Sequence, residues 1–73
     1  MSATERFADI RKMMDTCARG WTFHVSKHSR VIKYNSMVYR KFPKHDDVEL
    51  GHIRHMARHF GILECARTIL VSL

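Results

Sequence analysis

A candidate chemical site centres on His28, which lies in the polar stretch Ser26-Lys27-His28-Ser29-Arg30. Histidine exchanges protons near neutral pH because its unperturbed pKa is about 6.5. Lys27 and Arg30 place two positive charges beside the imidazole, and such charges help to hold a phosphate. This short basic loop is therefore the first place in the chain where we expect chemistry.

The loop belongs to a longer segment, residues 19–45, that contains no Asp or Glu. The seven basic residues of this segment are Arg19, Lys27, Arg30, Lys33, Arg40, Lys41 and Lys44. The rest of the chain nearly balances its charges, so this segment generates the net charge of +6. Mixed charges would keep a small domain equally soluble, whereas an acid-free run makes a directed field. We therefore expect the segment to contact nucleic acid.

The same segment predicts a three-stranded antiparallel sheet, with strands at residues 21–25, 31–34 and 37–42 and a tight turn at Asn35-Ser36. Pairing across the turn sets Tyr34 opposite Met37, Ile32 opposite Tyr39, Lys33 opposite Val38 and Val31 opposite Arg40. The face with Ile32 and Tyr39 is the expected core face, and Lys33 and Arg40 are expected on the solvent face.

Helices are expected before and after the sheet. Residues 2–18 open with the possible capping box Ser2-x-x-Glu5 and end before Gly20. Pro43 should end the third strand, and Asp47 should cap a second helix over residues 48–60. For residues 63–73 we favour a short helix over a strand. In the first strand, Phe23 and Val25 are expected in the core and His24 on the polar side.

The chain length of 73 residues indicates one domain, residues 1–73, with a single core. The sequence has no apolar run long enough for a membrane helix and no apolar signal region at its start, so we expect a cytoplasmic protein without membrane contact. Cys17 and Cys65 fall among apolar helical positions and are expected to be buried free thiols, not a disulfide or a metal pair.

Three further histidines, His52, His55 and His59, recur at helical spacing in the second expected helix. They share one stripe, opposite to the apolar positions. A metal site would need a fourth ligand and supporting partners, and the sequence has no CxxC or HExxH motif to supply them. We therefore expect no metal and interpret the stripe as a solvated face or a partner contact.

The order of helix, three strands, helix and short C-terminal helix is the layout of a double-stranded-RNA-binding-like α+β fold with its helices on one face of the sheet. Within it, five short motifs resemble the HicA family of toxin endoribonucleases, over roughly residues 7 to 62. The motifs are Gly20-Trp21, Lys27-His28-Ser29, Phe42-Pro43-Lys44-His45, Leu50-Gly51-His52-Ile53-Arg54 and Phe60-Gly61-Ile62.

The resemblance implies cleavage of mRNA by a single histidine without a cofactor, and neutralisation by a HicB-like antitoxin. The matching histidine is His28, which would remove the proton of a 2′-hydroxyl so that its oxygen attacks the adjacent phosphorus. The expected RNA-binding residues are Lys27, Arg30, Lys33, Arg40, Lys41 and Lys44. His45 and His24 are the candidates for the acid that protonates the leaving group.

One departure from the family leaves a second function open. Members often have Gly-Ser before the histidine, whereas this chain has Ser26-Lys27. The alternative is a degenerate relative of the same fold that binds RNA or a protein without cutting. Replacement of His28 by Ala distinguishes the two functions. In a nuclease it should abolish cleavage and leave RNA affinity unchanged, whereas in a binding module it should change little.

Overall fold

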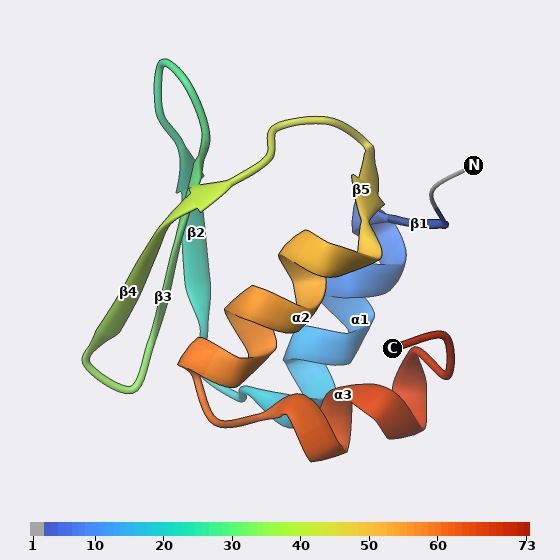
Figure 1. The fold of residues 1–73 in the computed structure, drawn as a ribbon. Helices are drawn as coiled ribbons and strands as arrows, with labels where there is room; N and C mark the ends of the chain where they lie inside the picture. The colour runs from blue at the N-terminus through green and yellow to red at the C-terminus, as the bar shows by residue number, and fades with distance from the viewer. Residues whose placement is uncertain (1–2) are drawn as a thin grey trace.

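The computed structural model describes residues 3–73, which form a small α+β domain with three helices and two antiparallel sheets (Figure 1). In chain order the elements are β1 (Thr4–Arg6), α1 (Phe7–Cys17), β2 (Thr22–Val25), β3 (Arg30–Tyr34), β4 (Met37–Phe42), β5 (Asp47–Glu49), α2 (Leu50–His59) and α3 (Leu63–Ile69). The C-terminal segment is therefore helical, as predicted. Within residues 3–73, no helix is long and apolar enough to cross a membrane.

The larger sheet has the strand order β2-β3-β4 and largely the predicted register. Ile32 pairs with Tyr39, Lys33 with Val38 and Tyr34 with Met37. Asn35 and Ser36 have φ values of 50° and 68°, as a two-residue turn that follows the strand twist requires. Pro43 follows directly after β4, so the strand ends where the missing proline N–H predicts.

The predicted pairing of Val31 with Arg40 is wrong, because the register shifts between Ile32 and Arg30. The next pair after Ile32–Tyr39 is Arg30–Phe42. Between these two pairs β3 has one residue, whereas β4 has two. An extra residue of this kind forms a β-bulge. The bulge keeps Phe42 buried on the core face and leaves Arg40 and Lys41 exposed side by side in the chain.

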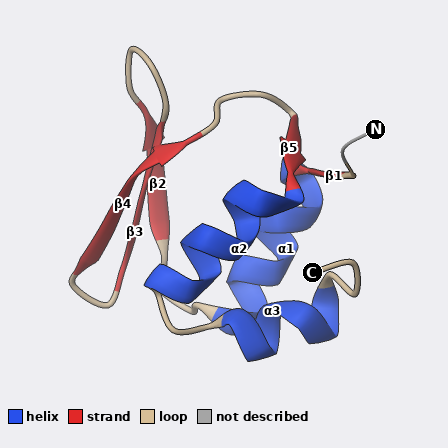
Figure 2. Ribbon diagram, in the orientation of Figure 1, coloured by secondary structure: helices blue, strands red, loops and turns tan. Residues whose placement is uncertain are grey.

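The three helices lie on one side of the larger sheet (Figure 2). Ile32 and Phe42 of the sheet are buried against the helices, and Tyr34, Met37, Tyr39 and Phe23 pack at the edge of this core. The helical part of the core consists mainly of Phe7, Ile10, Met13, Met14, Ile53, Met56 and Phe60. The prediction that Val25 is a core residue is wrong. Its side chain is 59% exposed, because the end of β2 extends beyond the helices (Figure 1).

The two predicted helix caps are also wrong, because the residues before α1 and α2 form a second sheet. Glu5 pairs with Val48 and Arg6 with Asp47 in the β1-β5 pair, while Ser2 lies outside the described residues. The N-cap positions are Arg6 and Glu49, and neither forms a side-chain cap bond. Instead, the first backbone N–H of each helix donates to the other segment, Phe7 to the Asp46 carbonyl and Leu50 to the Ala3 carbonyl. Strand pairing thus satisfies donors that side chains usually cap.

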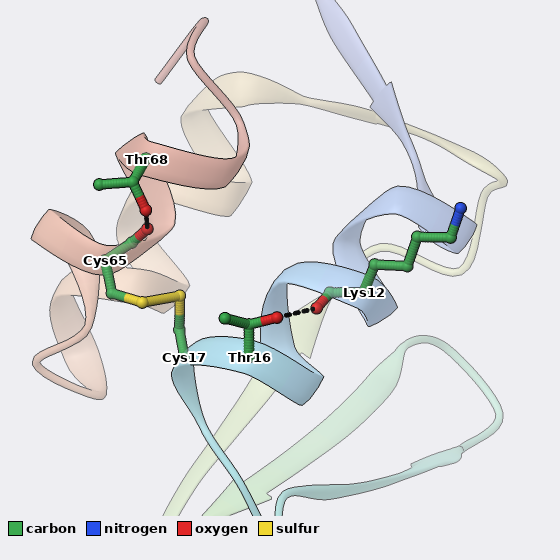
Figure 3. The surroundings of a disulfide bond; sticks show 5 residues. All are labelled: Lys12, Thr16, Cys17, Cys65 and Thr68. Carbon is green, nitrogen blue, oxygen red and sulfur yellow. Dashed lines mark hydrogen bonds between the residues drawn. A yellow bond between two sulfur atoms is a disulfide. The ribbon is translucent and has the colours of Figure 1, made fainter.

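Cys17 and Cys65 form a disulfide between α1 and α3 (Figure 3), so the prediction of free thiols is wrong. The two residues are 48 positions apart in the sequence, but the packing of α3 on α1 brings their Cα atoms to 5.7 Å. That separation lies within the range a disulfide spans. The bond joins the first helix covalently to the last.

Candidate site around His28

The loop that carries His28 is a closed four-residue connection between β2 and β3. Ser26 and Ser29 close it, because the Ser26 N–H donates to the Ser29 carbonyl at 2.7 Å and the Ser26 hydroxyl donates to the same oxygen at 2.9 Å. The Ser29 N–H in turn donates to the Ser26 hydroxyl oxygen. Lys27 and His28 are exposed between these two serines. The serines thus hold His28 outward in a short, defined turn.

Two further hydrogen bonds fix this loop to the segments that follow β3. The Ser29 hydroxyl donates to the Arg40 carbonyl at 2.6 Å, at the β4 bulge. Lys44 Nζ donates to the Lys27 carbonyl at 2.8 Å. The structure therefore brings the backbone of Arg40 and the side chain of Lys44 to the His28 loop. Among the described residues, the His28 side chain itself makes no hydrogen bond and no ion pair.

Arg30 differs from the other predicted phosphate contacts because it is only 6% exposed. One terminal guanidinium nitrogen donates to the Pro43 carbonyl at 2.8 Å and to the His45 carbonyl at 2.9 Å. The guanidinium carbon lies 3.5 Å from the centre of the Phe7 ring, which is cation–π geometry. A direct contact between Arg30 and phosphate, as predicted, does not fit this position.

The burial of Arg30 has an electrostatic cost. Loss of water lowers the pKa of the guanidinium below its ordinary value, and the nearby Asp46 charge opposes this change. An arginine stays protonated under such conditions. Its Nε is buried and has no hydrogen-bond partner among the described residues. Arg30 is thus a buried cation with one unpaired donor.

The remaining predicted binding residues are exposed. Lys33 lies on the solvent face of the sheet between Thr22 and Val38, its cross-strand neighbours. Lys41 follows Arg40 at the bulge, and both are exposed. These three cations and the His28 loop belong to one sheet and its adjoining loops.

The two candidate acids occupy different places. His24 is exposed on β2 and pairs with Val31. His45 is exposed after Pro43, and its carbonyl accepts a hydrogen bond from Arg30. Within the described part of the chain, neither side chain bonds to His28. The role of leaving-group acid therefore stays a prediction for both residues.

His28 lies on open surface. Three hollows of about 430, 300 and 340 Å³ lie elsewhere, beside Arg6 and Asp46, at the β3–β4 turn, and beside His52 and His55. None of the three includes His28.

The histidines of α2 do not act as a set. His52 and His55 are exposed, whereas His59 Nε2 lies 2.9 Å from the Val38 carbonyl oxygen and its ring packs beside Tyr39. His59 is exposed as well, so the predicted outward orientation holds for all three histidines, and the contact of His59 with Val38 links α2 to β4. Among residues 3–73, no group of three or more His, Cys, Asp or Glu side chains is arranged to hold a metal.

Sequence reasoning missed the residues that support the site. Ser26 and Ser29 close the loop, and serine pairs in short connections are a known turn signal. Phe7 was visible only as a core residue of α1, and its position beneath Arg30 depends on how the helix packs against the sheet. No local pattern could have indicated that contact.

Comparison with known proteins identifies no relative: no family model matches the chain, and no curated protein or solved structure matches it significantly.

Proposed function

We propose that this chain is a metal-independent endoribonuclease of the HicA type, the toxin of a toxin-antitoxin pair, with His28 as its general base. The observation that carries the proposal is the exposed His28 between Ser26 and Ser29, in a loop that Lys44 and the Arg40 carbonyl hold in place. A reactive imidazole free of internal partners, next to cations on a basic sheet, has the features that phosphodiester cleavage needs.

In the proposed reaction, neutral His28 accepts the proton of a ribose 2′-hydroxyl. The 2′-oxygen then forms a bond to the adjacent phosphorus, and the bond from phosphorus to the 5′-oxygen of the next nucleotide breaks. A proton donor, for which His45 and His24 are candidates, protonates this leaving oxygen. The products are a 2′,3′-cyclic phosphate and a 5′-hydroxyl, so protons and electrons balance without a metal or other cofactor.

The cations divide into two groups in this proposal. Lys27 and Lys44 adjoin His28 and would stabilise the negative charge of the pentacoordinate transition state. Lys44 uses one of its three ammonium donors on the Lys27 carbonyl, which leaves two for phosphate oxygens. Lys33, Arg40 and Lys41 would contact flanking phosphates along the sheet and position the strand.

The remaining expectations are parts of the same proposal. The order α1, β2-β3-β4, α2 with the helices on one face supports a double-stranded-RNA-binding-like fold. A HicA-type toxin would act on mRNA in the cytoplasm and would be inhibited by a HicB-like antitoxin. The basic segment 19–45, which contains no Asp or Glu, supports an acidic inhibitor that competes with RNA.

The decisive experiment compares the wild-type protein with His28→Ala on a single-stranded RNA, measuring both cleavage and affinity. We expect His28→Ala to reduce cleavage by at least about 100-fold, the scale of general-base catalysis, with RNA affinity changed less than threefold. The 3′ ends of the products should carry the cyclic phosphate. His24→Ala and His45→Ala, tested in parallel, should identify the acid. Loss of the acid should slow cleavage of ordinary RNA, but not cleavage of a substrate whose leaving group is acidic enough to depart without being protonated.

The second candidate is a module of the same fold that binds RNA without cutting. The open surface around His28, with no acid bonded to it, favours this function more than an enclosed site would. Binding of RNA without cleavage at any pH between 5 and 9, with no effect of His28→Ala, would establish the binding module in place of the nuclease.

A further inference from the structure

Arg30 connects the two loops that form the candidate site. It is the first residue of β3 and so directly follows the His28 loop, residues 26–29. Its guanidinium donates to the carbonyls of Pro43 and His45, the residues on either side of Lys44. The backbone around Lys44 is therefore held from inside the protein by a side chain that begins at the base of the His28 loop.

A second contact joins the same two loops from the outside. Lys44 Nζ donates to the Lys27 carbonyl, next to His28. Together, the hydrogen bonds of Arg30 and Lys44 connect residues 26–30 with residues 43–45 at two separate points. Two separate connections restrict the relative motion of the two loops more than one would, since each remains when the other breaks.

The start of α1 contacts both Arg30 and the segment that follows Lys44. The Phe7 ring lies against the guanidinium of Arg30, and the Phe7 N–H donates to the Asp46 carbonyl at 2.7 Å. Phe7 itself packs edge-on against Phe23 and beside Phe42. The loop after β4 is thus attached to the hydrophobic core through Phe7 and to the sheet through Arg30.

The chemistry of this position requires arginine. A guanidinium is planar, so it can lie on an aromatic ring and still donate in its own plane, whereas a lysine ammonium is a compact charge with a strong hydration shell. Stability alone is a poor reason for the residue, because a buried cation with an unpaired Nε is costly and an apolar side chain would avoid that cost.

We propose that Arg30 is a positioning residue, whose buried guanidinium fixes the Lys44 loop against the His28 loop so that both present their cations and imidazole to one RNA phosphate. This inference rests on the proposed function for its kinetic effect. Arg30 acts through its neighbours and touches no substrate, and a displacement of about 1 Å in catalytic groups can cost about 100-fold in rate.

Arg54 offers a matched control. It also donates to two backbone carbonyls, those of Leu73 and Ser72, and it lies in α2 facing the C-terminal end of the chain. Arg54→Met removes contacts of the same kind without touching the loops at residues 26–29 and 43–46. A general loss of stability should therefore appear in both variants, and a loss of positioning only at Arg30.

The experiment measures kcat, KM, melting temperature and amide hydrogen exchange for Arg30→Met, Arg30→Lys and Arg54→Met. We expect Arg30→Met to lower kcat by about 100-fold with KM within about threefold. The amide of Phe7, which donates to the Asp46 carbonyl of the Lys44 loop, should exchange at least tenfold faster, while the melting temperature falls no more than in Arg54→Met. Arg30→Lys keeps the charge but loses the planar geometry, and should show the same pattern to a smaller degree.

Equal changes in kcat for Arg30→Met and Arg54→Met, or unchanged exchange of the Phe7 amide, would overturn the inference. If Arg30→Met does not fold, Arg30→Lys decides by the same readings. If the wild-type protein cleaves no RNA, the proposed function fails, and hydrogen exchange alone decides whether Arg30 fixes the Lys44 loop. Faster exchange of the Phe7 amide in Arg30→Met than in Arg54→Met supports that role, and equal exchange overturns it.

Discussion

Lys44 Nζ lies 2.8 Å from the backbone carbonyl oxygen of Lys27, so two residues of like charge are held together across 17 positions of sequence. The contact is favourable because the ammonium donates to a carbonyl dipole and not to the other side chain. It gathers positive charge beside His28 without an acidic residue between the cations. An anion such as a phosphate would relieve the repulsion between them.

Replacement of Lys44 by Met should therefore affect the site twice, by removing a cation and by releasing the Lys27 carbonyl. We expect about tenfold slower cleavage and weaker RNA binding, while Lys44→Arg should keep most of both. Lys12→Met on α1 is the control, because Lys12 is an exposed lysine outside the basic segment. Equal effects of Lys44→Met and Lys12→Met on cleavage would show that Lys44 has no special role.

RNA affinity should fall as salt rises, with a slope of about 0.7 in log K per phosphate neutralised on a single strand. The double reversal Lys33→Glu with Arg40→Glu should weaken RNA binding and reduce this slope. Lys12→Glu with Arg67→Glu changes the net charge equally on the helical side and is the matched control. An affinity independent of salt, or equal losses in both double variants, would contradict the basic sheet as the binding surface.

The Lys33→Glu, Arg40→Glu double variant should also bind an acidic inhibitor more weakly. If a HicB-like partner covers this surface, its association should be fast at low salt and should slow as ionic strength rises, because charge complementarity acts mainly on the association rate. Stopped-flow measurements with the Lys33→Glu, Arg40→Glu variant test this. Weaker RNA binding with unchanged partner association would mean that inhibition occurs at another surface.

Cleavage should survive EDTA. The described residues contain no metal-binding group of three side chains, and the proposed reaction needs only His28, a proton donor and cations. Activity should be assayed before and after exhaustive chelation, with His52→Ala as a control for adventitious metal at the α2 histidines. Activity that is lost in chelator and restored by zinc or manganese would assign a role to those histidines after all.

Opening the disulfide should lower the stability of the domain. The chain-entropy model gives about 4 kcal/mol for a closed loop of this length, since Cys17 and Cys65 are 48 positions apart. Urea melts with and without a reducing agent test this, and the Cys17→Ser, Cys65→Ser double variant should not respond to the reducing agent. In a reducing cytoplasm the lower stability would apply. Identical melts would mean that α3 holds its place without the bond.

Sequence patterns predicted the parts of the fold that depend on local order. Alternation in residues 31–34 and 37–42 and the Asn35-Ser36 turn predicted the register from the turn as far as Ile32 and Tyr39, because a two-residue turn fixes how the adjoining residues pair. The bulge beyond Ile32 was not predicted. The helical spacing predicted α1 and α2 to within about two residues at three of their four ends. The error is larger at the start of α1, where β1 takes the place of the predicted first turn.

The errors share a physical cause, which is that they depend on contacts between distant segments. The pairing of Glu5 with Val48 replaced a local capping box, and the packing of α3 on α1 brought Cys17 to Cys65. For the candidate site, the exposure of His28 and Lys44 followed the prediction, whereas the burial of Arg30 depends on Phe7. A basic residue in a basic run gives no local sign that it faces inward.

The disulfide also makes the protein a ring with two tails. Residues 17 to 65 form a covalent loop that contains the whole β2-β3-β4 sheet and both loops of the candidate site. A single protease cut at the exposed Asn35-Ser36 turn would open the backbone and yet leave one molecule, whose two pieces separate only on reduction. A cut in α1 before Cys17 would release a free fragment. The domain could therefore be cut at this exposed turn without losing the covalent connection between its two halves.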